Sequence, residues 1–82
     1  MDAKQIGEHI MQTRKKQNFK QAEAAGYLNV GIRFLSDLEN GKPTAQIGKA
    51  IEVIEGLGFE VMLVPKKRRD LINLVKEALD DE

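Results

Sequence analysis

The sequence contains no cysteine and no tryptophan, and it has a single histidine among its 82 residues. Without cysteine the chain can form neither a disulfide nor a thiolate zinc site, and it offers no thiol nucleophile. His9 has no second histidine to share a metal ion with, which argues against any metal centre. We therefore expect no metal, no cofactor and a reducing, cytoplasmic compartment.

Long apolar runs are also missing. No stretch approaches the roughly 20 residues that a membrane helix needs, and the N-terminus lacks the apolar core of a signal peptide. The acidic cluster from Asp80 to Glu82 stands at the end of the chain, where no pocket can form around it for acid-base chemistry. These absences argue against a membrane protein and against an enzyme.

The sequence has no excess of positive or negative charge, because 13 basic side chains balance 13 acidic ones. The net charge of zero therefore gives no indication of a polyanionic partner. With 41% hydrophobic residues, the chain has the apolar content of one small folded domain.

Apolar residues recur at steps of three and four and predict four helices. The first follows the capping pair Asp2 and Gln5, and the fourth is capped by Thr44. Asn18 and Asn29 can take the left-handed conformation that ends a helix, and Gly31 is an acceptable cap for the third helix. The first two helices are predicted at about 3–17 and 21–28, the third stops at Asn40 and Gly41, and the fourth ends at Gly58. The predicted buried stripes are Ile6, Ile10 and Met11; Ala24, Ala25 and Leu28; Phe34, Leu35 and Leu38; and Ile47, Ala50, Ile51, Ile54 and Leu57.

Residues 59–64 change to a period of two, which predicts a β-strand that Pro65 ends. A single strand cannot satisfy its own backbone N–H and C=O groups, so its partner must be another copy of the chain. The sequence thus predicts a homodimer joined across a two-fold axis by Phe59, Val61, Met62 and Leu63.

Residues 65–82 form a separate segment, with a basic run at 66–69 followed by an amphipathic tail. The basic run can be read as a solvated hinge, as a DNA arm or as an attachment point for an acidic partner. A fifth helix capped by Asp70 is too short to be stable alone, so we expect it to order against a partner. Its apolar stripe is Leu71, Leu74, Val75, Ala78 and Leu79.

Three segments, 19–25, 29–31 and 34–42, resemble the helix-turn-helix of the Xre/Cro-type repressors. They parallel the patterns Leu-Thr-Gln-x-x-Leu-Ala, Gly-Val-Ser and Leu-x-x-Leu-Glu-x-Gly-Lys of that family. Residues 41–49 and 57–61 look like the HipB-type antitoxins. The resemblance implies an all-α, lambda-repressor-like domain over residues 1–64, with four to five helices and one C-terminal β-strand pairing across a homodimer.

The same resemblance implies roles on double-stranded operator DNA, where the third helix would enter the major groove. Asp37 could accept a hydrogen bond from a cytosine amine, or repel phosphates and so restrict the register. Arg14 and Glu39 would form a structural ion pair. The implied base contacts are Ile32, Arg33 and Asp37, and the implied phosphate contacts are Lys20, Gln21, Gly31, Asn40, Lys42 and Thr44.

The function that the resemblance implies is that of a bacterial, nucleoid-associated repressor. It would be the antitoxin that autoregulates its own operon and neutralises a HipA-like serine/threonine kinase. Two alternatives stay open: a free-standing or phage-type regulator without a toxin, and a protein-interaction module that has lost DNA binding. Steep salt dependence of DNA binding would exclude the last of these.

Overall fold

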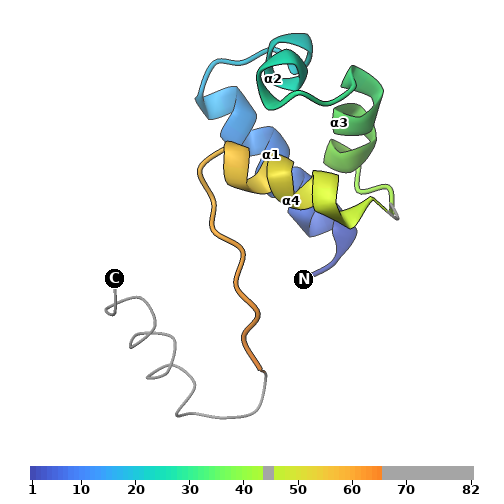
Figure 1. Cartoon of the computed structure of the whole chain (residues 1–82), viewed down its shortest axis with the longest axis vertical. Coiled ribbons are helices and arrows are strands. Elements are labelled where there is room, and N and C mark those ends of the chain that lie inside the picture. Colours follow the sequence, from blue (N-terminus) through green and yellow to red (C-terminus); the bar gives the residue numbers. More distant parts are fainter. Residues whose placement is uncertain (44–45, 66–82) are drawn as a thin grey trace.

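The computed structural model describes residues 1–43 and 46–65 and builds them from helices (Figure 1). The helices are α1 (Ala3–Lys16), α2 (Gln21–Leu28), α3 (Ile32–Glu39) and α4 (Ile47–Gly56). The all-helical prediction is confirmed for this part of the chain. Thr44, the basic run and the predicted fifth helix, with Leu71, Leu74, Val75, Ala78 and Leu79, lie outside the described residues.

The helix ends follow the local chemistry of the sequence. The Gln5 N–H donates to the Asp2 carboxylate at 2.8 Å, and the Asp2 N–H donates to the Gln5 side chain at 3.0 Å, so the predicted capping pair begins α1. Asn18 and Asn29 take positive φ angles of 61° and 57°. The left-handed turns after α1 and α2 are thus confirmed.

The core is formed where α1, α3 and α4 meet. Ile10, Leu35 and Val53, one from each helix, are the largest fully buried side chains. Ala24 and Ala25 of α2 close the same cluster, so that α3 packs on both α1 and α2. Small side chains on α2 let it approach the others closely, which fixes how α3 is presented to solvent.

The start of α4 differs from the prediction. The helix begins at Ile47 with Gln46 in the capping position, so Thr44 is not its N-cap. Ile47 is 70% exposed, whereas Val53, which was not in the predicted stripe, is fully buried. Ile47 is the first residue of α4, whereas the residues of this helix and its C-cap that pack into or against the core, Ala50, Val53, Ile54 and Leu57, lie further along, so helical period alone did not identify the buried set.

Gly7 is a point of close approach between α1 and the end of α3. A Cβ added there would meet the backbone carbonyl oxygens of Leu38 and Glu39, the latter at 2.6 Å. Neither oxygen can move without distorting the end of α3. Glycine at this position therefore sets the distance between the first and third helices.

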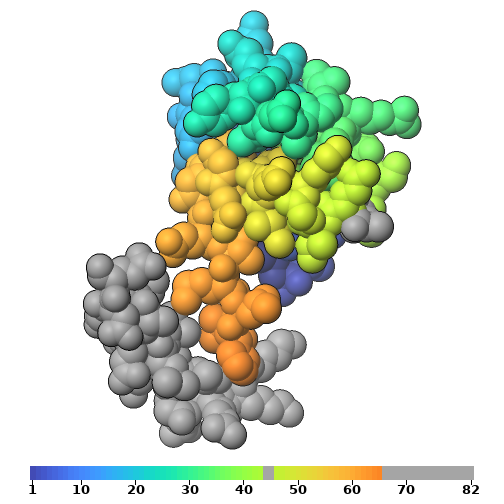
Figure 2. Space-filling view, in the orientation of Figure 1, coloured from blue at the N-terminus to red at the C-terminus, as the bar shows by residue number. Residues whose placement is uncertain are grey.

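The segment after α4 leaves the helical body as an extended stretch rather than as a strand (Figures 1 and 2). Gly58 turns the chain with a φ of 103°, and Phe59 donates its N–H to the Ile54 carbonyl at 3.2 Å. The predicted strand at 59–64 is not formed in the isolated chain, in which the described residues supply no neighbouring strand. Val61, Met62, Leu63 and Val64 are 42%, 43%, 95% and 52% exposed.

A search for membrane-crossing helices within 1–43 and 46–65 finds none of sufficient length and apolar character.

We predict that Gly7→Ala destabilises the fold by about 1 to 3 kcal/mol, because the added methyl group collides with backbone that cannot yield. Gly26 in α2 is the matched control, since a Cβ built there meets nothing within 4 Å. Gly26→Ala should raise stability by about 0.5 to 1 kcal/mol through helix propensity and a less flexible unfolded chain. Urea unfolding followed by circular dichroism measures both, and equal stabilities for the two variants would contradict the packing argument.

Candidate nucleic-acid interface

A tight turn joins α2 to α3. Asn29 adopts the left-handed conformation, and the Val30 N–H then returns to the Ala25 carbonyl at 3.0 Å, which closes the end of α2. Gly31 caps the next helix without a side-chain hydrogen bond, and the Leu35 N–H bonds to its carbonyl at 3.1 Å. This helix, short turn, helix arrangement is the one that places a second helix in a DNA groove.

The third helix has two faces of different character. Leu35 and Leu38 are buried in the core, whereas Ile32 is 51% exposed and Arg33 is exposed beside it. Because the buried leucines hold the helix, the backbone at its start is held with Ile32 and Arg33 on the solvent side. The structure thus places the predicted readers Ile32 and Arg33 at the exposed N-terminal turn of α3.

The start of α2 is held by its third residue. Lys20 stands in the capping position and has no acceptor in its side chain, but its backbone N–H donates to the Glu23 carboxylate at 2.9 Å. The first backbone N–H groups of α2 remain the natural anion contact of this helix. The Lys20 side chain is exposed, and it and this backbone are the groups that could take the phosphate role predicted for Lys20 and Gln21.

The Gln21 side chain itself points inward. Its amide nitrogen donates to Glu39 Oε1 at 3.1 Å, which brings the beginning of α2 next to the end of α3. This orientation was not predicted from the sequence, in which Gln21 was assigned to a phosphate. The hydrogen bond ties two of the predicted phosphate-binding regions, the start of α2 and the loop after α3, into one unit.

Arg14 and Glu39 form the ion pair that the resemblance implied. Arg14 Nε donates to Glu39 Oε2 at 2.6 Å and Nη2 donates to Oε1 at 2.9 Å, with the side chains only 10% and 2% exposed. Arg14 Nη1 also donates to the Phe19 carbonyl at 2.8 Å. The hydrogen bond to Glu39 raises the pKa of Arg14 despite its burial, so the guanidinium stays protonated.

A second ion pair lies on the surface at the end of α3. Lys42 Nζ is 3.8 Å from Asp37 Oδ2, and the Lys42 N–H bonds to the Asp37 carbonyl at 3.0 Å. Asn40 and Lys42 are exposed in this loop, and Gly41 turns it with a φ of 78°. Asp37, predicted as a base contact, is therefore paired with a predicted phosphate contact.

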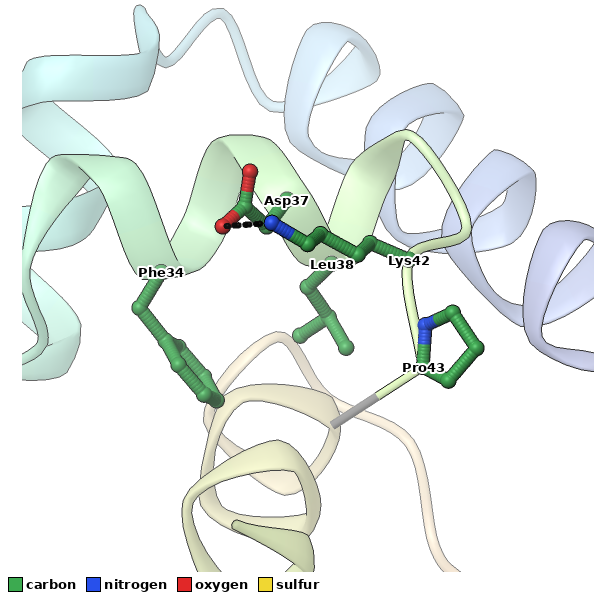
Figure 3. A pocket seen from close by; sticks show the side chains of 5 residues that line it. All are labelled: Phe34, Asp37, Leu38, Lys42 and Pro43. Carbon is green, nitrogen blue, oxygen red and sulfur yellow. Dashed lines mark ion pairs between the residues drawn. The ribbon is translucent and has the colours of Figure 1, made fainter. Parts of the chain in front are cut away.

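A small hollow of about 160 Å³ lies under this pair, lined by Phe34, Asp37, Leu38, Lys42 and Pro43 (Figure 3). The Lys49 ammonium, from the first turn of α4, stands 5.7 Å from the centre of the Phe34 ring. Sequence reasoning did not single out Lys49. The available signal was its position in the first turn of the helix that follows the loop, and it adds a second cation beside Lys42 at this end of the molecule.

The other predicted residues do not join this surface. His9 is exposed on α1, and the described residues hold no group of three His, Asp or Glu side chains that could bind a metal ion. Phe59, Val61, Met62 and Leu63 lie on the extended segment that follows α4. The candidate interface is thus formed by the starts of α2 and α3 and by the loop that follows α3.

Comparison with known proteins identifies a family and two relatives of this chain. A family described as helix-turn-helix matches residues 10–61. An uncharacterized HTH-type transcriptional regulator, y4mF, of Sinorhizobium fredii is 51% identical over 65 residues, which cover 78% of this chain and 86% of the relative. The ImmF control region 10 kDa protein of Bacillus phage phi105 is 33% identical over 64 residues, covering 76% of this chain and 71% of the relative. No solved structure gives a significant match.

We predict that Glu39→Ala destabilises the fold by about 3 to 5 kcal/mol, because it leaves the Arg14 guanidinium buried without its counter-charge. The control is the double variant Arg14→Met with Glu39→Leu, which removes both charges and should be clearly more stable than Glu39→Ala. Urea unfolding followed by circular dichroism measures all three proteins. If the double variant is no more stable than Glu39→Ala, the destabilisation does not come from the unpaired charge of Arg14.

Proposed function

The chain belongs to the helix-turn-helix family of transcription regulators, and we propose that it acts as a sequence-specific, homodimeric repressor that binds double-stranded operator DNA. The observation that carries the proposal is the exposed pair Ile32 and Arg33 on a helix whose opposite face is buried. Arg33 can donate two hydrogen bonds to the O6 and N7 atoms of guanine, and Ile32 can contact a thymine methyl group. Asp37, one turn further on, is the third residue that the resemblance assigned to a base, and in the structure its carboxylate lies 3.8 Å from the Lys42 ammonium.

The proposed phosphate contacts surround this reading helix. The backbone at the start of α2, the Lys20 side chain, the N-cap Gly31 and the loop with Asn40 and Lys42 supply N–H groups and positive charge. Thr44 completes the set as predicted from the sequence. Such contacts fix the position and orientation of the protein without reading bases, because phosphates are the same at every step.

The proposed dimer uses the segment that follows α4. Val61, Met62 and Leu63 are 42%, 43% and 95% exposed, which is unusual for consecutive apolar residues. Pairing with the same segment of a second copy would satisfy the free backbone groups and cover Phe59, Val61, Met62 and Leu63. It would also place two recognition helices about one turn of DNA, roughly 34 Å, apart.

The finer role in this proposal is that of an antitoxin which represses its own operon and binds a HipA-like kinase through the stripe Leu71, Leu74, Val75, Ala78 and Leu79. Its support is the resemblance of residues 41–49 and 57–61 to the HipB-type antitoxins. The relative from the control region of a phage favours a second candidate, a regulator without a toxin. The antitoxin role is supported if the gene lies beside a reading frame for a kinase that arrests growth, and if this chain relieves that arrest. If no such kinase is encoded there, the regulator without a toxin is the better candidate.

Arg33→Ala should lower the preference for the operator by about 1 to 3 kcal/mol, since each bidentate guanine contact is worth that much discrimination. The operator is the duplex that the wild-type chain enriches from a random-sequence pool, and a scrambled duplex of the same composition is the reference. Titrations on both duplexes measure the preference.

The matched control for Arg33→Ala is Lys20→Ala, which removes the proposed phosphate contact of an exposed side chain at the start of α2 and should weaken binding to both duplexes. If Arg33→Ala leaves the preference unchanged while the fold is intact, Arg33 does not read a base. If the wild-type chain enriches no sequence at all, the repressor proposal is wrong.

Met62→Pro should give a monomer that keeps its helices and loses high-affinity operator binding if the Met62 N–H faces the partner strand, because proline cannot donate to a ladder. Val61→Pro tests the opposite phase of the strand. Sedimentation at micromolar concentration supplies the measurement for both. Two variants that stay dimeric would place the subunit interface elsewhere.

A further inference from the structure

The inference concerns Asp37, whose negative charge lies where the proposed function needs positive charge. Asp37 is four residues after Arg33 on α3 and is therefore on the same side of the helix, one turn along. A carboxylate on a surface that faces phosphates weakens binding to every DNA sequence. Such a residue contributes to function only if it opposes the wrong sequences more than the right one.

The contacts of Asp37 suggest how it does so. Its carboxylate lies 3.8 Å from the Lys42 ammonium, and Figure 3 shows the Lys42 side chain running back from the loop over Leu38 to reach it. The Lys42 N–H also bonds to the Asp37 carbonyl at 3.0 Å, which holds the two residues together at the backbone. Lys42 is thus directed toward the carboxylate by the turn that ends α3.

A competing anion can replace Asp37 in its ion pair with Lys42. The side chains of Lys42 and Asp37 are 64% and 42% exposed, so water and incoming anions reach both. An exposed pair of this kind is weak, and a DNA phosphate can take the place of the carboxylate. The buried pair between Arg14 and Glu39, with side chains 10% and 2% exposed, has no such access and stays closed.

We propose that Asp37 is a specificity-determining residue that acts through Lys42. In the free protein and on unrelated DNA, the Asp37 carboxylate forms an ion pair with the Lys42 ammonium, which then does not bind a phosphate. When α3 is seated on the operator, a phosphate is brought close enough to displace Asp37, and Lys42 then contributes its contact. This inference rests on the proposed DNA binding and adds to it the residue that withholds one contact from non-specific sequences.

The test compares the salt dependence of binding for Asp37→Asn and the wild-type chain on the operator and scrambled duplexes defined above. Each phosphate contact adds about 0.9 to the slope of log affinity against log salt. Asp37→Asn should raise the slope on the scrambled duplex by about one contact and tighten that binding roughly 3- to 10-fold. On the operator, where the wild-type lysine already has its phosphate, the slope should stay the same.

Three further variants separate the mechanism from simpler effects. In a Lys42→Gln background, adding Asp37→Asn should leave both slopes unchanged, because there is no ammonium to release. Asp37→Glu keeps the charge and should preserve the wild-type slopes. Glu55→Gln makes the same change of charge in the last turn of α4 and should not raise the slope on the scrambled duplex alone.

The outcomes that overturn the proposal are distinct. An equal rise of slope in the Lys42→Gln background would mean that Asp37 merely repels phosphates. Loss of operator binding with unchanged scrambled binding would mean that Asp37 accepts a hydrogen bond from a base. Salt-independent binding of the wild-type chain to both duplexes would overturn the proposed function itself, and with it the role of Asp37.

Discussion

The arrangement of this domain depends on the buried pair between Arg14 and Glu39. The arginine extends from α1 to the last residue of α3, and the same guanidinium holds the Phe19 carbonyl just before α2. Gln21 adds a hydrogen bond from the first residue of α2 to the same carboxylate. One charged centre therefore connects three helices at the points where α2 begins and α3 ends, which are the regions proposed to hold phosphates.

This connection has a consequence for interpreting variants. A residue that breaks the network changes the relative position of two phosphate-binding regions as well as the stability of the fold, so its effect on DNA affinity does not identify a DNA contact. Gly7 belongs to the same region, because it lets α1 approach the Leu38 and Glu39 carbonyls. Residues such as Arg33 and Asp37, which stand outside the buried network, are the ones whose DNA effects can be read directly.

Local chemistry predicted much of the fold, and tertiary packing decided the rest. Asn18 and Asn29 end helices because asparagine tolerates the left-handed conformation, and Asp2 begins one because its carboxylate meets free N–H groups, so each could be read from neighbouring residues. Val53 was missed in favour of Ile47 because both belong to one apolar stripe, and tertiary packing buries the later part of α4 while leaving its first residue exposed. The inward turn of Gln21 and the pairing of Asp37 with Lys42 depend on side-chain directions that no sequence spacing specifies. The Arg14–Glu39 pair came from the resemblance, since partners 25 positions apart leave no local signal.

A net charge of zero is compatible with a DNA-binding surface because each acidic side chain of the helix-turn-helix is paired with a donor or a cation of the protein itself. Between Lys20 and Lys42 the carboxylates are Glu23, Asp37 and Glu39. Glu39 is buried against Arg14, Glu23 accepts from the Lys20 backbone, and Asp37 meets Lys42. Arg33 stays exposed at the start of α3. Of the three carboxylates, only Asp37 is paired with an exposed cation that a DNA phosphate can also bind. Competition between this carboxylate and a phosphate for Lys42 is therefore where binding to the operator and binding to unrelated DNA can differ.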